Sequence, residues 1–326
     1  MNYKPIIVVG GEPNSIFLEI FFKVIRKNKF NNPIILISSK RLLNLQIKKL
    51  GFKKKIRLLD DLDLEKKIDN KTINLINVEY NQKKAFEKIS TKSNIFIENS
   101  FRLAFEIIKE KKVYKFINGP ISKKTFLNKK FLGITEFISN KFKIKKTAML
   151  IYNKDLSVCP VTTHLPLKSV ARKINKKIIR EKISLINSFY KKNFNIIPKI
   201  AILGLNPHCE SVDRYNEDEK IIKPCIKSLR RSYNVSGPYS ADTIFLKDNR
   251  RKFNVIVGMY HDQVLTPFKT LYEYDAINIT LGLPFTRVSP DHGPNEKMLG
   301  KNLSNPLSLL KAINFLDKNW LKQKRV

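Results

Sequence analysis

The chain has 326 residues, of which 42% are hydrophobic, and a formal net charge of +35. This length allows one large domain or two lobes, and no apolar run approaches the roughly 20 residues that a membrane-spanning helix needs. The three cysteines form no CxxC pair or metal-finger spacing, and the short apolar stretch at the N-terminus lacks a following cleavage site. We therefore expect a cytoplasmic protein.

The predicted elements alternate along the chain between short apolar runs and amphipathic segments. This alternation predicts an α/β fold with a largely parallel sheet, in which any two lobes are interleaved in sequence. As one catalytic unit over residues 1–326, the chain would divide approximately into 1–125 plus 280–326, and 126–279. In chain order we expect a strand at 5–11, a helix at 15–28, a strand at 32–38, a helix at 40–51, a strand at 71–78, a helix at 99–112, strands at 113–122, 146–153 and 156–164, a long helical stretch at 167–193, and strands at 198–208 and 255–257.

The positive charge is spread along the whole chain in pairs and triplets of lysine, as in FKKKIR and KFKIKK. Specific binding of nucleic acid favours basic residues clustered on one element with aromatic residues between them. Lysine-rich helical faces are more commonly solvated surfaces, and a positive field attracts anionic small molecules. A basic, non-enzymatic nucleic-acid-binding protein is nevertheless the alternative from another functional class.

Two nucleotide-binding motifs are absent from the sequence. The first predicted strand ends in Gly10 and Gly11 without a G-x-G-x-x-G pattern, and G-x-x-x-x-G-K-[ST] occurs nowhere. A standard dinucleotide-binding half is therefore not predicted.

The four histidines all follow apolar runs, where predicted strands end. The carboxyl ends of parallel strands share one edge of a sheet, so these positions converge. Three imidazoles from different strands suit a divalent transition metal with open positions for substrate oxygens, although a lone loop histidine is more often solvated. The histidines are His164, His208, His261 and His292.

Charged residues accompany these histidines. Lys269 and Arg287 could clamp a phosphate or carboxylate. The carboxylates Asp242, Asp262 and Asp291 could fix imidazole tautomers or carry protons. The alternatives are that Asp262 caps a turn, that Asp242 is the N-cap of a helix beginning at TIF, and that Arg287 pairs with a surface acid. These residues predict a metal-assisted enzyme that acts on an anionic small molecule.

Several of these segments together resemble one known family. VTTHLPL, GLNPH, GP with ADTIF, YHDQ with Pro267 and Lys269, and NITLGLPF with Arg287 and SPDHG resemble, in order, the 4-hydroxythreonine-4-phosphate dehydrogenases of pyridoxal phosphate (vitamin B6) biosynthesis. The resemblance implies an isocitrate/isopropylmalate dehydrogenase-like fold of two α/β/α lobes with a cleft. It also implies a homodimer with active sites at the subunit interface, and NAD or NADP bound without the usual glycine motif.

The resemblance also implies roles for individual residues. His164, His208 and His261 match the metal-binding histidines, whereas His292 does not. The implied reaction is oxidation of the C3 hydroxyl of 4-hydroxythreonine 4-phosphate, followed by decarboxylation to 3-amino-2-oxopropyl phosphate. The ion could be zinc, cobalt, manganese or magnesium. The substrate-contacting positions are matched by Thr135, Lys269, Asn278 and Arg287.

The sequence departs from the family pattern at one position expected to contact the substrate phosphate. Ile134 stands where the family has a histidine, and isoleucine can neither donate a hydrogen bond nor carry charge. Either nearby lysines compensate, or the enzyme is a related dehydrogenase of another hydroxy acid, such as a sugar-acid phosphate or a dihydrodiol dicarboxylate.

Overall fold

The computed structural model describes residues 4–60, 68–110, 113–128, 130–131, 133–213, 215–290 and 292–318. The chain forms two compact units that are interleaved in sequence. Unit 1 contains the described residues of 4–138 and 284–318, and unit 2 contains those of 139–283. Helix α4 (Ile134–Lys141) carries the chain from the first unit into the second.

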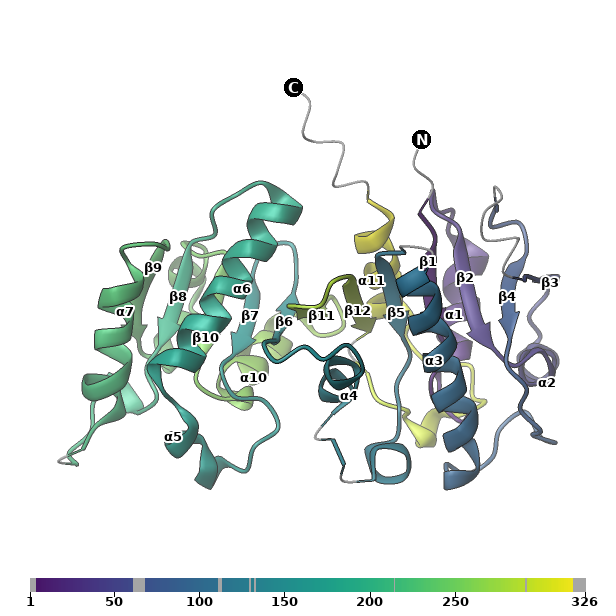
Figure 1. The fold of residues 1–326 in the computed structure, drawn as a ribbon, viewed down its shortest axis with the longest axis horizontal. Helices are drawn as coiled ribbons and strands as arrows, with labels where there is room; N and C mark the ends of the chain where they lie inside the picture. The colour runs from purple at the N-terminus through teal and green to yellow at the C-terminus, as the bar shows by residue number, and fades with distance from the viewer. Residues whose placement is uncertain are drawn as a thin grey trace. The chain divides into compact units, whose positions relative to one another are not determined.

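The strands of unit 1 are all parallel, as the alternation of strands and helices predicts. Helix α3 (Asn94–Glu110) packs against the two central strands, and Figure 1 shows it in front of them. Because helices cover the sheet, its two central strands are almost continuously apolar and are buried throughout. In sheet order the strands are β3 (Ile56–Leu58), β4 (Ile73–Asn77), β2 (Ile34–Ser38), β1 (Ile6–Val9), β5 (Lys115–Asn118) and β12 (Thr286–Pro290).

One of the other helices of unit 1 begins and ends at residues that suit these positions. Helix α2 (Lys40–Leu50) begins after Ser39, whose hydroxyl accepts from the backbone N–H of Leu42 at 3.3 Å. It ends at Gly51, which adopts the left-handed conformation (φ 63°) that glycine favours. Helices α1 (Phe17–Lys27) and α11 (Leu307–Asp317) contact each other.

Unit 2 contains both parallel and antiparallel strands. The first three strands in the order of its sheet pair antiparallel with one another, and the following pairs, from the third strand to the sixth, are parallel. The unit is therefore mixed, with a parallel half. In sheet order its strands are β11 (Ile277–Leu281), β6 (Ala148–Tyr152), β7 (Ser157–Pro160), β10 (Val255–Gly258), β8 (Ile200–Leu203) and β9 (Val235–Tyr239).

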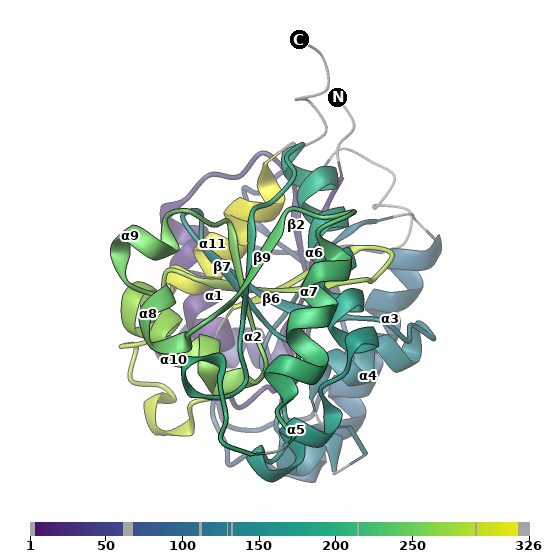
Figure 2. The ribbon, with the colours of Figure 1, turned by 90° about the vertical axis from the view of Figure 1, so that its left-hand side faces the viewer.

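Helices cover both faces of this second sheet. Figure 2 shows α6 and α7 on one face and α8, α9 and α10 on the other. Helix α10 contacts β7 and β10, and its buried residues Val264 and Phe268 pack in the same apolar cluster as Val158 and Ile256. The helices of the unit are α5 (Val170–Lys173), α6 (Lys176–Phe194), α7 (Lys223–Leu229), α8 (Ala241–Ile244), α9 (Lys247–Arg250) and α10 (His261–Tyr272).

Two local expectations from the sequence were wrong. The long helical stretch at 167–193 is broken, because Asn175 caps α6 by accepting from the backbone N–H of Ile178 at 3.0 Å. Asp242 is not an N-cap, since α8 begins at Ala241 and Asp242 lies inside its first turn. Within the described residues, no helix is long and apolar enough to cross a membrane.

Candidate functional site

Three of the four histidines lie in unit 2, each just beyond the carboxyl end of a parallel strand. His164 follows β7, His208 follows β8, and His261 follows β10 as the first residue of α10. Strand β10 pairs with both β7 and β8, so the three loops leave neighbouring strands at the same edge of the sheet. This is the edge at which parallel α/β sheets bind ligands.

The structure brings two of these histidines together. The ring centroids of His164 and His261 lie 6.0 Å apart. Two imidazoles that share one ion at the usual Zn–N distance of about 2.1 Å have centroids about 5 to 6 Å apart. The side chain of Asp262 accepts from Nδ1 of His261 at 2.6 Å. A carboxylate on Nδ1 leaves Nε2 of His261 as the nitrogen with a lone pair, which is the usual arrangement for a metal ligand.

His208 lies on the third loop, in a short 3-10 turn (Pro207–Cys209), and its side chain is exposed. Its backbone is left-handed (φ 54°, ψ 16°), a conformation that is uncommon outside glycine and asparagine. In the part of the chain that the structure describes, no three histidine, cysteine or acidic side chains are grouped closely enough to hold an ion. Even so, two adjacent imidazoles and a third on the next loop form a donor set suited to a divalent metal.

A second polar cluster lies in unit 1 around Arg287 on β12. The guanidinium is completely buried and donates from Nε to Oδ1 of Asn118 at 2.8 Å and from Nη1 to the hydroxyl of Thr135 at 3.0 Å. Burial lowers the pKa of Arg287 to about 10, and the carboxylate of Glu136 opposes that shift. The side chain therefore stays charged at neutral pH. It is not the surface ion pair that the sequence left open.

The other predicted site residues differ in their surroundings. Lys269 on α10 and Asp242 on α8 are exposed, and Asp291 lies outside the described residues. Asn278 on β11 is half-buried, and its Oδ1 is buried without a hydrogen-bond partner among the described residues. An orphaned buried acceptor of this kind suits a ligand that donates a hydrogen bond.

The sequence did not single out two members of the arginine cluster. Asn118 ends β5 and holds the guanidinium, and Glu136 lies one residue beyond Thr135 in α4. The NGP sequence directly after a strand was the available signal for Asn118, because asparagine at a strand end commonly makes local hydrogen bonds. Ile134 is the first residue of α4 and is half-buried.

Comparisons with known proteins agree over almost the whole chain. The family "Pyridoxal phosphate biosynthetic protein PdxA" matches residues 29–316. A 4-hydroxythreonine-4-phosphate dehydrogenase from Sulfurihydrogenibium sp. (strain YO3AOP1) is 37% identical over 93% of this chain and 94% of its own length.

Solved structures match the fold. The crystal structure of 4-hydroxythreonine-4-phosphate dehydrogenase from Klebsiella pneumoniae superposes with a TM-score of 0.84 at 26% identity, covering 98% of each chain. A terephthalate 1,2-cis-dihydrodiol dehydrogenase from Burkholderia xenovorans LB400 has a TM-score of 0.63 at 19% identity, covering 96% of this chain and 97% of its own, and shares the fold.

Proposed function

The chain belongs to the pyridoxal phosphate biosynthetic protein PdxA family, and from this premise we propose that it is a 4-hydroxythreonine-4-phosphate dehydrogenase of pyridoxal phosphate biosynthesis. The reaction is oxidation of the C3 hydroxyl of the substrate by hydride transfer to NAD or NADP, followed by loss of carbon dioxide to give 3-amino-2-oxopropyl phosphate. The observation that carries the proposal is the set of three histidines beyond adjacent parallel strands in a chain of this family.

His164, His208 and His261 are the residues that would hold a divalent metal. When bound, such an ion lowers the pKa of a hydroxyl and stabilises negative charge on oxygen. Asp262 holds His261 in the tautomer that leaves Nε2 unprotonated. Zinc or cobalt fits an all-imidazole set better than magnesium, which prefers oxygen ligands.

The remaining residues bind and orient the anionic substrate. Arg287 presents a permanent positive charge that Asn118 and Thr135 hold in one orientation. Lys269 adds a second cation, and Oδ1 of Asn278 is available to accept a hydrogen bond from a hydroxyl or ammonium group. These are the residues that would bind the carboxylate and phosphate groups of the substrate and orient its C3 hydroxyl.

We propose two further properties of the assembly. The two units are the lobes of an isocitrate/isopropylmalate dehydrogenase-like fold. The active enzyme is a homodimer with its sites at the subunit interface.

One observation favours a second candidate function. Ile134 supplies no hydrogen bond or charge at the position where the family has a histidine. A related dehydrogenase that acts on another hydroxy acid, such as a sugar-acid phosphate or a dihydrodiol dicarboxylate, would not need that histidine.

The decisive assay is reduction of NAD and of NADP by the purified protein with 4-hydroxythreonine 4-phosphate. Turnover should stop on chelation and return on addition of zinc or cobalt, and His208→Ala should abolish it. Val212→Ala is the matched control, because Val212 lies just beyond His208 in the chain and its side chain is fully exposed. Metal-loaded, folded protein that reduces the cofactor only with another hydroxy acid would refute the substrate assignment.

A further inference from the structure

A single buried amide joins two of the three histidine-bearing loops of unit 2. Nε2 of Gln263 donates to the carbonyl oxygen of Gly204 at 2.8 Å, and its Oε1 accepts from the backbone N–H of Met259 at 2.7 Å. Gly204 begins the loop that carries His208, and Met259 begins the turn that carries His261. The side chain is 9% exposed, and both ends of its amide are occupied, so its orientation is fixed.

The third loop is attached to the same residue, Met259. The hydroxyl of Thr162 donates to the carbonyl oxygen of Met259 at 2.7 Å, and its backbone N–H reaches the same oxygen at 3.2 Å. Thr162 is buried and lies two residues before His164. Met259 therefore links all three loops, because its N–H bonds to Gln263 and its C=O bonds to Thr162.

The backbone leaves room for this network. A Cβ atom on Gly258 would lie 2.8 Å from Oε1 of Gln263 and 2.5 Å from the side chain of Val264. At such separations something must shift, so only glycine fits at the end of β10 with Gln263 in this position. Each of these residues lies outside the set expected to bind metal or substrate.

We infer that Gln263 is a positioning residue that fixes the three histidine-bearing loops relative to one another, with Thr162 as the second point of attachment. This inference rests on the proposed three-histidine metal site and extends it to residues that touch neither metal nor substrate. Changing a residue that orients metal ligands typically costs about 10- to 100-fold in metal affinity. A residue that served only to stabilise the fold would alter unfolding and leave the metal site unchanged.

Gln263→Glu tests the inference with minimal change of shape. A carboxylate keeps the acceptor for Met259 but directs an oxygen at the carbonyl of Gly204, where no donor remains. Titrated with cobalt(II), the full-length variant should bind about 10- to 100-fold more weakly than the parent protein, and its visible absorption spectrum should change.

The matched control is Gln46→Glu in unit 1. Gln46 is fully buried, and its Nε2 donates to the carbonyl oxygens of Pro13 at 3.1 Å and Ala85 at 3.0 Å. This variant should lose thermal stability comparably, while its cobalt affinity and spectrum stay those of the parent protein.

A second pair of variants covers the case in which Gln263→Glu fails to fold. Thr162→Val removes the hydroxyl and keeps the shape, and it should weaken cobalt binding about tenfold. Thr162→Ser keeps the hydroxyl and should restore the parent affinity and spectrum.

Two outcomes separate this inference from the proposal on which it rests. If the parent protein binds cobalt through His208, as the loss in His208→Ala would show, and Gln263→Glu or Thr162→Val binds it equally well, the positioning role is wrong and the metal site stands. If the parent protein does not bind cobalt, or His208→Ala binds it unchanged, the metal site fails and the positioning role fails with it.

Discussion

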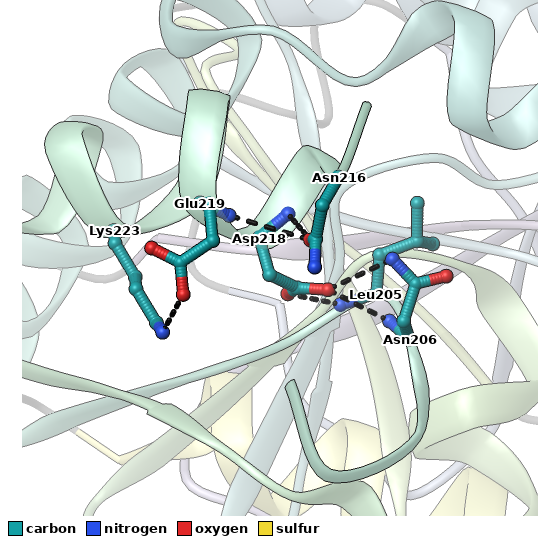
Figure 3. Close-up of polar contacts among 6 residues, drawn as sticks. All are labelled: Leu205, Asn206, Asn216, Asp218, Glu219 and Lys223. Atoms are coloured by element: carbon teal, nitrogen blue, oxygen red, sulfur yellow. Dashed lines mark hydrogen bonds and ion pairs between the residues drawn. The ribbon is translucent and has the colours of Figure 1, made fainter. Parts of the chain in front are cut away.

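The buried carboxylate of Asp218 binds the loop between β8 and His208 through hydrogen bonds. Its side chain is fully buried and accepts from the backbone N–H groups of Leu205 at 2.8 Å and Asn206 at 3.1 Å, and from the side-chain amide of Asn206 at 2.9 Å (Figure 3). A Cβ atom on Gly204 would lie 2.7 Å from Oδ1 of Asp218, so the glycine makes room for the carboxylate. We expect Asp218→Asn to destabilise this loop.

The magnitude follows from the bonds that the amide cannot make. The asparagine side chain has one acceptor oxygen, so the hydrogen bonds to the second carboxylate oxygen are lost. Its NH₂ group takes the place of that oxygen and faces an N–H donor. Hydrogen bonds to a charged group contribute about 1.5–3 kcal/mol each, and of the three one is lost if the amide oxygen takes the position of Oδ2 and two are lost if it takes that of Oδ1. Removing the buried charge also removes several kcal/mol of desolvation cost, which offsets part of the loss. The expected decrease in the free energy of unfolding is about 2 kcal/mol.

Urea denaturation of the variant beside the parent protein measures this loss. Glu219→Gln is the control, because Glu219 is the adjacent acidic residue and forms an exposed ion pair with Lys223 (Figure 3). Exposed pairs contribute at most about 1 kcal/mol, so the control should change little. The reasoning is refuted if Asp218→Asn and Glu219→Gln unfold at the same urea concentration.

Three further predictions concern unit 1. Arg287→Lys should lower kcat/KM for the proposed substrate by about 10- to 100-fold, because an ammonium cannot make both guanidinium bonds, whereas Thr135→Ser, which keeps the hydroxyl, should retain activity. Burial raises the pKa of Glu12, so the free energy of unfolding of the parent protein should decrease as the pH rises from the unfolded-state pKa toward the folded-state pKa. In pH-dependent unfolding, Glu12→Gln should lack this decrease, and at acid pH it should be no more stable than the parent protein. Gly119→Ala should lower the melting temperature strongly, because its Cβ would meet the carbonyl oxygen of Gly10 and lie 2.8 Å from Phe17. Gly293→Ala is the control and should not lower it, because a Cβ there would point into open space. Equal melting temperatures of the two variants would contradict this packing.

Local sequence patterns predicted most strands and the edge of the sheet at which polar residues gather. The apolar runs that became β1, β2, β7 and β8 are short, bounded and rich in β-branched residues, and these features depend only on neighbours in the chain. The start of α10 at His261 was not predicted. Pro267 lies inside this helix, where proline is unfavourable, so the local sequence argues against the helix that forms.

The residues that hold the histidine loops could not be identified from periodicity. Gln263 and Thr162 act through bonds to backbone groups about 60 and 100 positions away, and such bonds leave no local pattern. Asp218 likewise accepts from backbone N–H groups 12 and 13 positions away. The glycines that end β8 and β10 were the available signal, because a glycine at a strand end often marks a close approach by another group.

The strand order of unit 2 also determines when in folding its histidines become neighbours. Strand β10 pairs with β7 and β8, which precede it in the chain, through Val255 with Ser157 and with Ile200. Contacts between distant parts of a chain form late, because the intervening segment must first lose its conformational freedom. During synthesis, a nascent chain that does not yet include β10 contains His164 and His208. It lacks β10, which lies between β7 and β8, the strands that precede these two histidines. Binding of an ion by all three histidines would therefore follow completion of this sheet. Metal binding would then occur only in a folded unit 2, and it could not start the folding of this unit.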